Sequence, residues 1–336
     1  MSRYRIMECA TGVSKHIVLS FLLAVTIGTV FSQKKVSRNP YFKYVLPGSG
    51  DSTTFYLSEF NKDRKLPLIV FIQGSGFNSL FSRQQSSIIP TSGHIDLTYL
   101  AKGKAKILIV EKPGVRYLDE YGPGERNMYF DANFSLDSWS RRVAKTIKHV
   151  VSIEQVKSDS IMLIGHSEGG VVAAKVAKLM QGSISKVCIL AGEGTSQLYS
   201  LYTFAKSGVF FKEYGKTEDE RLTYLLKTWN DIRADSTSTT KFFWGFTYLR
   251  WHSFLRTSVL EELSSFRGSV LIMQGEKDTH VAPESARILY SGLLAKGVKS
   301  KLLMIEDADH SFNSSNITHL DGWSQALEQS LEWMLE

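Results

Sequence analysis

The sequence has few cysteines and no cluster of metal-ligating residues. Of its 336 residues only two are cysteines, Cys9 near the N-terminus and Cys188 inside an apolar stretch. A fold built on disulfide bonds is therefore excluded, and a chain of this length can be stabilised by its own hydrophobic core. No group of cysteine and histidine residues has the spacing of a metal site. We expect neither a metal nor another cofactor.

A concentration of charge of one sign is also absent. The sequence contains 40 lysine and arginine residues against 33 aspartate and glutamate residues, which gives a formal net charge of +7. The basic residues are scattered along the chain, with Lys34-Lys35 and Arg141-Arg142 as the pairs of note. Because nucleic-acid binding requires a basic patch or stripe, we expect no nucleic-acid partner.

An uncharged and largely apolar stretch covers residues 16–32. Its length of about 17 residues is long for the core of a signal peptide and short for a transmembrane helix. Val30-Phe31-Ser32 supplies small or acceptable residues before Gln33 for cleavage by a signal peptidase. We interpret residues 1–32 as an export signal, which places the protein in the periplasm or outside the cell. The alternative is an uncleaved anchor, in which only residues 16–32 contact a membrane.

A strand, a sharp turn and a helix are predicted around Ser167. Residues 161–164 are apolar and run directly into Gly165-His166-Ser167-Glu168-Gly169, and a helix-forming segment follows at 171–180. A serine on such a turn takes a strained backbone conformation, which only small residues two positions to either side tolerate. Ser167 is therefore the predicted nucleophile.

Two later strands end in residues that complete a catalytic triad. The apolar stretch 269–274 leads into a turn that carries Asp278, and the stretch 301–305 leads to His310. A serine hydroxyl needs a base, and the base needs an orienting carboxylate. Ser167 as nucleophile, His310 as base and then acid, and Asp278 as orienting acid are the candidate catalytic residues.

These motifs resemble the α/β-hydrolase superfamily from about residue 40 to 336. The pattern Gly-His-Ser-Glu-Gly-Gly with Gln-Gly-Glu-Lys-Asp is most similar to small carboxylesterases and to the catalytic domains of serine peptidases of the prolyl oligopeptidase type. Strand and helix patterns also alternate from Leu66 onward, which favours an α/β fold with a mostly parallel central sheet and helices on both faces. The resemblance implies a core in two parts, 33–194 and 267–336, and a helical cap inserted at 195–266.

The resemblance also implies an oxyanion hole in the loop after the buried strand 66–73. The backbone N–H of Ser75 is the first candidate donor, and Gly74 and Gly76 are alternatives. Gln73-Gly74 stands where the superfamily usually has a His-Gly pair. The partner donor is the backbone N–H of Glu168, the residue after the nucleophile.

Some other residues compete for the catalytic roles. In some members of the superfamily the acid follows the preceding strand, where this chain has Glu193. His280 lies two residues after Asp278 and is predicted to be a pocket or surface residue. Asp309 is adjacent to His310 in sequence, so its side chain is expected to point away from that histidine.

The segment 195–266 is rich in aromatic residues and lacks the strand pattern, so we predict helices. Its aromatic side chains either roof an apolar pocket or form the core of the insertion itself. Hydrolysis of a carboxylic ester through an acyl-enzyme is the favoured function, with a small-molecule acyl substrate as partner. An aminopeptidase is the first alternative and would need an acid to hold the substrate ammonium, for which Glu111, Glu193 and Glu213 are candidates. A binding protein on a disabled hydrolase fold is the second alternative.

Overall fold

The computed structural model describes residues 34–35, 40–48, 51–58, 65–122, 124–153, 156–315 and 321–336. The predicted export signal at 1–32 lies outside the described residues. Among the helices that are described, none is both long and apolar enough to cross a membrane.

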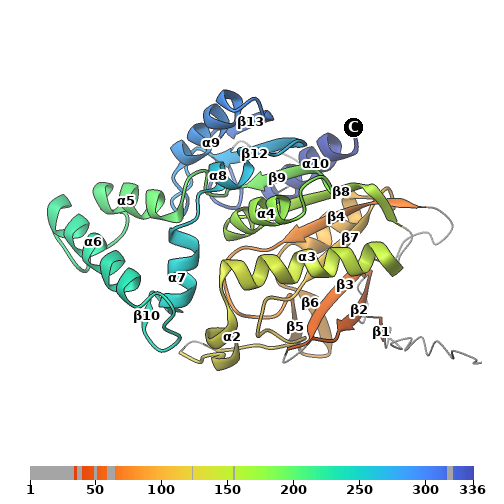
Figure 1. Ribbon diagram of the computed structural model, residues 1–336, viewed down its shortest axis with the longest axis horizontal. Helices are drawn as coiled ribbons and strands as arrows, with labels where there is room; N and C mark the ends of the chain where they lie inside the picture. Colours follow the sequence, from red (N-terminus) through yellow and green to blue (C-terminus); the bar gives the residue numbers. More distant parts are fainter. Residues whose placement is uncertain are drawn as a thin grey trace, which may run out of the picture. The chain divides into compact units, whose positions relative to one another are not determined.

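A nine-stranded sheet forms the centre of the fold, in the order β1-β2-β3-β7-β4-β8-β9-β12-β13 (Figure 1). The N-terminal strands β1, β2 and β3 pair antiparallel, and so do β3 and β7. All pairings from β7 to β13 are parallel. The strands are β1 (Lys34–Lys35), β2 (Tyr41–Leu46), β3 (Thr53–Ser58), β4 (Leu66–Ile72), β7 (Lys106–Val110), β8 (Val156–His166), β9 (Ile184–Leu190), β12 (Ser269–Gly275) and β13 (Lys299–Ile305).

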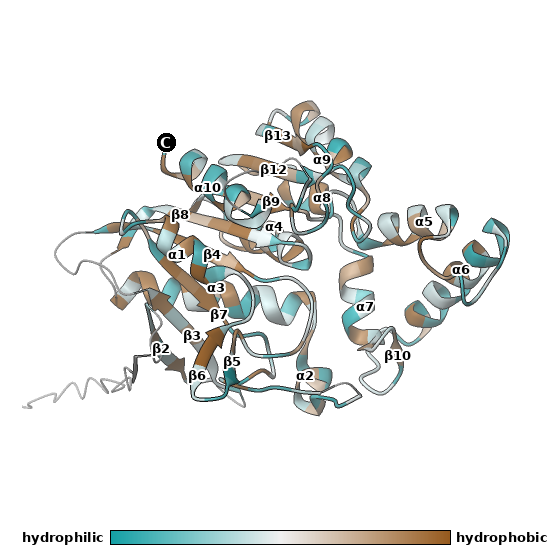
Figure 2. Cartoon of the chain, turned by 180° about the vertical axis from the view of Figure 1, so that it is seen from behind, coloured by the Kyte–Doolittle hydropathy of each residue, from teal (hydrophilic) through white to brown (hydrophobic). Residues whose placement is uncertain are grey.

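The central strands are apolar without alternation because helices cover both faces of the sheet. Helices α1 and α10 contact each other over one face. Helices α3 and α4 contact each other over the opposite face (Figures 1 and 2). The mostly parallel α/β fold expected from the sequence is confirmed. The helices that flank the sheet are α1 (His94–Leu100), α3 (Leu136–Ile153), α4 (Glu168–Leu179), α9 (Pro283–Ala295) and α10 (Gly322–Leu335), and the short helix α2 (Met128–Asn133) precedes α3 in the chain.

Strands and helices bury side chains in the pattern that their sequences predict. On α3 the apolar residues Trp139, Val143, Ile147 and Val150 are all buried. One layer of the core joins side chains of β4 and β7 to side chains of α1 and α10. Figure 2 shows the strands coloured mainly as hydrophobic, whereas the helices carry hydrophilic residues on their outer sides. A small separate hairpin is formed by β5 (Phe81–Gln84) and β6 (Ser87–Pro90).

The predicted cap segment is helical but also contains a β-hairpin that the sequence pattern did not reveal. In this hairpin β10 pairs antiparallel with β11. The two loop residues, Trp244 and Gly245, both have positive φ, at 43° and 76°. Positive φ at both positions is the geometry of a two-residue hairpin turn, and glycine at the second position favours it. The elements of 195–266 are α5 (Gln197–Ser207), α6 (Glu218–Ala234), β10 (Phe242–Phe243), β11 (Phe246–Thr247), α7 (Tyr248–Leu255) and α8 (Val259–Leu263).

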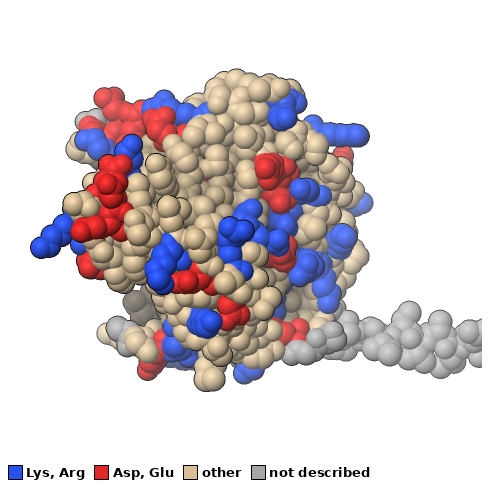
Figure 3. Space-filling view, turned by 60° about the vertical axis from the view of Figure 1, so that its left-hand side comes forward, with Lys and Arg blue, Asp and Glu red and all other residues tan. Residues whose placement is uncertain are grey.

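Many of the aromatic residues of this segment form a core of their own. Phe211, Phe243 and Trp251 are buried in a cluster with aliphatic residues of α5, α6 and α7. Helix α8, in contrast, packs against α4 and α9. On the face shown in Figure 3, basic and acidic side chains are interspersed.

Candidate active site

Ser167 lies at the turn between β8 and α4, in a conformation that the flanking glycines make possible. Its φ and ψ are 55° and −122°, outside the regions that L-residues usually occupy. A Cβ atom on Gly165 would lie 2.2 Å from the carbonyl oxygen of Gly169, and one on Gly169 would lie 2.2 Å from that of Ile72. The local sequence therefore allows β8, β4 and α4 to approach closely enough for this strained turn to form.

Asp278 and His310 lie on the loops that follow β12 and β13. The Nδ1 atom of His310 is 2.7 Å from Oδ2 of Asp278. Gln274 Nε2 also donates to Oδ2, while the backbone amides of His280 and Val281 donate to Oδ1. Burial by itself would raise the pKa of Asp278, but the hydrogen bonds from His310 and the two amides outweigh it and lower the pKa. The carboxylate is thus kept ionised and oriented toward His310.

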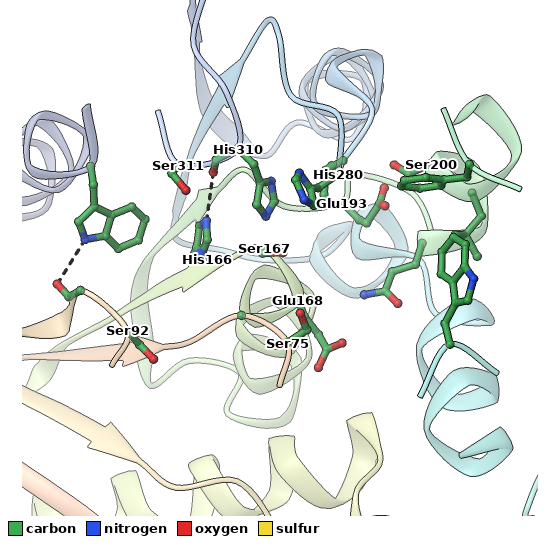
Figure 4. A pocket seen from close by; sticks show the side chains of 18 of the residues that line it. Ser75, Ser92, His166, Ser167, Glu168, Glu193, Ser200, His280, His310 and Ser311 are labelled. Carbon is green, nitrogen blue, oxygen red and sulfur yellow. Dashed lines mark hydrogen bonds between the residues drawn. The ribbon is translucent and has the colours of Figure 1, made fainter. Parts of the chain in front are cut away.

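Ser167 and His310 line the same cavity, which has a volume of about 670 Å³ (Figure 4). The structure therefore brings the predicted nucleophile to the predicted His310-Asp278 pair. His280 also lines this cavity, and its ring lies 4.8 Å from that of His310. Asp278, His280 and His310 are close enough to share a metal ion. Both oxygens of the Asp278 carboxylate, however, are already occupied by the four donors described above.

His166, to which the sequence assigned no role, contacts the backbone of His310. Its Nε2 atom lies 3.3 Å from the carbonyl oxygen of His310 (Figure 4). Burial and then the neighbouring His310 lower the pKa of His166 to about 4, so its imidazole is neutral and donates from Nε2. The only sequence signal was its place next to Ser167.

The loop 74–76 and the start of α4 lie on either side of Ser167. A Cβ atom on Gly74 would lie 3.3 Å from that of Ser167, so the loop passes directly beside the nucleophile. Gly74, Ser75 and Glu168 line the cavity, whereas Gly76 is not among its lining residues. Glu168 is the first residue of α4, so its N–H has no acceptor within the helix. In the described part of the chain the N–H of Ser75 has no acceptor either.

Two buried cations contact these segments, and neither was identified from the sequence. Lys112 follows β7 and donates from Nζ to the carbonyl oxygens of Gly74, at 2.5 Å, and Gly76, at 2.8 Å. Arg250 on α7 forms a buried ion pair with the carboxylate of Glu168. Burial, together with the charge of Arg250, lowers the pKa of Lys112 to about 7, and burial lowers that of Arg250 to about 9. The partners of these cations are distant in sequence, so no local motif marks them.

Glu193, Glu111 and Glu213, the other acids considered for a role in the site, lie in three different environments. Glu193 lines the cavity but accepts a hydrogen bond from Ser285 rather than from His310, and burial raises its pKa to about 7. Glu111 is buried against Tyr56 and Ser79 and is not among the residues that line the cavity. Glu213 is exposed. Of the three acids considered for binding an ammonium group, only Glu193 is in contact with the cavity.

The wall opposite the sheet is supplied by the segment 195–266. Phe210, Trp244 and Trp251 line the cavity together with Leu201. Phe210 and Trp244 pack edge to face, with ring centroids 5.2 Å apart. Asp309, in contrast, accepts bonds from the backbone amides of Ser311 and Asn313 and so points away from the imidazole beside it.

Comparisons with known proteins show the family and the fold of the chain. The model of the prolyl oligopeptidase family matches residues 141–335. Among solved structures, Est1E from Butyrivibrio proteoclasticus is 15% identical over 87% of this chain and 98% of its own, with a TM-score of 0.55. An acylaminoacyl peptidase of Pyrococcus horikoshii is 12% identical over 91% of this chain, with a TM-score of 0.58. This chain spans 40% of that peptidase. At these identities the two structures share the fold alone, and a search of curated proteins finds no match.

Proposed function

The chain belongs to the prolyl oligopeptidase family of serine hydrolases, and from this premise we propose that it is a carboxylesterase that cleaves esters with an apolar or aromatic acyl group. One observation carries the proposal. Ser167 and His310, which is paired with the buried Asp278, open into a cavity whose far wall is aromatic. Such a wall excludes water from the reacting carbonyl and favours an apolar group beside it.

The proposed reaction proceeds through an acyl-enzyme. His310 removes the proton of Ser167 as its oxygen attacks the ester carbonyl, and Asp278 holds the imidazole in the tautomer that can accept it. The backbone N–H groups of Ser75 and Glu168 donate to the developing oxyanion. His310 then returns the proton to the leaving alcohol, and a water molecule activated by the same histidine releases the acid.

The cavity supports the choice of acyl group. Its volume of about 670 Å³ lies within the range of sites for small organic molecules. Leu201, Phe210, Trp244 and Trp251 offer a hydrophobic surface that fits an aryl or medium alkyl chain. Est1E has been crystallised with ferulic acid, an aromatic carboxylic acid, and shares 15% of its residues with this chain at a TM-score of 0.57.

Glu193 favours a second candidate, an aminopeptidase. Its buried carboxyl group faces the cavity and has no basic partner among the described residues. A substrate ammonium group placed beside it would stabilise the ionised carboxylate and be held by it. An aminoacyl amide would then be cleaved by the same catalytic residues.

We further propose that the protein is exported, with residues 1–32 as the signal and residues 16–32 as the only membrane contact if cleavage does not occur. N-terminal sequencing of the protein isolated from its source checks this. A mature terminus at Gln33 supports cleavage, and an intact Met1 supports an anchor.

The experiment that tests the ester reaction compares the wild-type protein with Ser167→Ala on p-nitrophenyl esters of increasing acyl length. Ser92→Ala is the matched control, because Ser92 lines the same cavity without a proposed role. Activity lost in Ser167→Ala and kept in Ser92→Ala is expected. Equal rates in all three proteins would contradict the role of Ser167.

The two candidates separate on a second substrate. Aminoacyl p-nitroanilides cleaved by the wild type, and much more slowly by Glu193→Gln, would support the aminopeptidase. If neither esters nor amides are cleaved, a binding role becomes the better proposal.

A further inference from the structure

Lys112 is a buried cation that the reaction proposed above does not use. It is 2% exposed, and within the described residues no carboxylate lies within ion-pair distance of it. Its ammonium group contacts the ring of Trp139, at 4.6 Å from the centroid, and the two loop carbonyls already described. The adjacent Glu111 acts on this ammonium group only through space, and its carboxylate is hydrogen-bonded to Tyr56 and Ser79. Burying an ammonium group without a direct ion pair is costly, and an apolar side chain would fill this space at less cost. The role of Lys112 therefore lies in the two loop carbonyls that it binds and not in a contribution to stability.

Peptide geometry links Lys112 to the proposed oxyanion hole. In a trans peptide unit, the C=O of one residue and the N–H of the next point in opposite directions. The C=O of Gly74 points to Lys112, so the N–H of Ser75 points away from it. Gly74 and Ser75 line the cavity, whereas Lys112 is not among the lining residues. The N–H of Ser75 is thereby directed to the side of the loop on which Ser167 lies.

The hydrogen bond from Lys112 to the carbonyl oxygen of Gly76 makes the loop 74–76 more rigid. Gly76 has a φ of 113°, a backbone conformation that favours glycine. Because glycine has no side chain to restrict its backbone, the loop is not held in one conformation by steric contacts of its own. By binding the carbonyls of both Gly74 and Gly76, Lys112 restrains the loop on each side of Ser75. A donor that is oriented before the reaction needs no reorganisation when the oxyanion forms.

We infer that Lys112 is a positioning residue for the oxyanion hole: it orients the N–H of Ser75 through the carbonyls of Gly74 and Gly76 and, in its protonated form, places a positive charge behind that donor. The inference rests on the proposed hydrolase function. Lys112 acts through the loop and does not touch the substrate.

The test compares Lys112→Met, an unbranched apolar side chain that lacks the terminal ammonium group, with Lys112→Arg, which keeps the charge and the donors. Lys106→Met is the matched control, because it removes a buried lysine from the opposite end of β7. Losing one oxyanion donor typically lowers kcat by about 100- to 1,000-fold. We expect a fall in kcat of about 100-fold in Lys112→Met with KM nearly unchanged, partial recovery in Lys112→Arg, and no change in Lys106→Met.

A second readout separates this inference from the proposed substrate. A fluorophosphonate probe phosphonylates a reactive serine and develops negative charge on the phosphoryl oxygen without needing turnover. Its rate of reaction with Ser167 should fall in Lys112→Met in parallel with kcat. If the wild type cleaves no ester but reacts with the probe, the ester proposal fails and the Lys112 inference is still tested. If Ser167 in the wild type does not react with the probe, both are overturned.

Thermal unfolding shows whether each variant is folded. A folded Lys112→Met protein with wild-type kcat and probe rate would overturn the inference, and so would an increase in KM alone. If Lys112→Met does not fold, Lys112→Gln replaces it, because it retains a donor at this position without the charge. A probe rate for Lys112→Gln equal to that of the wild type would then overturn the role of the charge.

Discussion

The two sides of the cavity are built by different means. On the sheet side, Ser167, Asp278 and His310 follow the C-terminal ends of β8, β12 and β13, which belong to one parallel sheet. Their proximity follows from backbone pairing. On the cap side, Phe210 lies in the loop after α5, Trp244 lies in the turn between β10 and β11, and Trp251 lies on α7. Their positions follow from the packing of side chains.

This difference indicates which side governs which property. A hydrogen-bonded parallel sheet allows little displacement of the residues at its edge, so the sheet side determines the chemistry. An aromatic cluster can be repacked with moderate changes in energy, so we expect the cap side to select which substrate shapes fit the cavity. The ion pair of Arg250 with Glu168 connects the two, because it joins the cap to the residue next to the nucleophile.

The largest effect is expected from a change at the sheet edge. Asp278→Asn leaves the shape intact but removes the charge that orients His310, so kcat should fall by about 10,000-fold. Glu193→Gln is the matched control, an acid of the same cavity that does not contact His310. Steady-state ester hydrolysis measures both. A comparable loss of ester activity in Glu193→Gln would mean that the orienting acid has been misassigned.

Removing the ion pair between Arg250 and Glu168 should strongly lower the stability of the protein. Arg250→Met leaves the Glu168 carboxylate buried without its partner, which typically costs about 3 to 5 kcal/mol in the free energy of unfolding. Urea denaturation measures this loss, and adding Glu168→Gln should recover much of it. Lys227→Met is the control, since the exposed ion pair of Lys227 with Asp231 contributes at most about 0.5 kcal/mol. Equal losses in the two single variants would argue against the pair as the connection.

Glu193 should make stability depend on pH. Burial raises its pKa in the folded protein to about 7 from a value of 4.5, so the folded state binds the proton more tightly. The stability from this group is complete below pH 4.5 and is lost as the pH rises to about 7. Glu193→Gln should therefore stabilise the protein at pH 8, by an amount of the order of 3 kcal/mol, and have little effect near pH 4.5. A pH-independent effect in urea denaturation would contradict this environment for Glu193.

The smallest effect is expected from the cap. Trp244 is 37% exposed and lines the cavity at the tip of the β10-β11 hairpin. Trp244→Ala should lower kcat/KM for aryl or long-chain esters by about tenfold relative to kcat/KM for acetate esters, because one aromatic contact of the acyl group is lost. Phe242→Ala, an exposed residue of the same hairpin outside the cavity lining, is the control. An equal change in both variants would indicate a general loosening of the cap.

Much of the fold and the candidate catalytic residues could be predicted from the sequence. The apolar stretches from 66 to 305 correspond to strands of the parallel part of the sheet, which are largely buried except for the edge strand β13, and Gly165 and Gly169 indicate the turn at Ser167. Asp278 and His310 were predicted as partners because each follows an apolar stretch in the order Ser, Asp, His, and because a serine nucleophile needs a base and the base needs a carboxylate. These inferences needed only local patterns and the order of the motifs along the chain.

The sequence by itself therefore indicated the alternation of strands and helices, Ser167 and His310 as nucleophile and base, and Asp278 ahead of Glu193 as the acid. Only the tertiary structure decided that His310 pairs with Asp278 and not Glu193, that Trp244 faces the cavity, that Lys112 holds a loop 36 to 38 residues away, and that Arg250 reaches Glu168 across 82 residues. The physical reason is that such contacts depend on the packing of side chains from separate elements, and neither the spacing of residues nor their hydrophobic pattern records which elements meet.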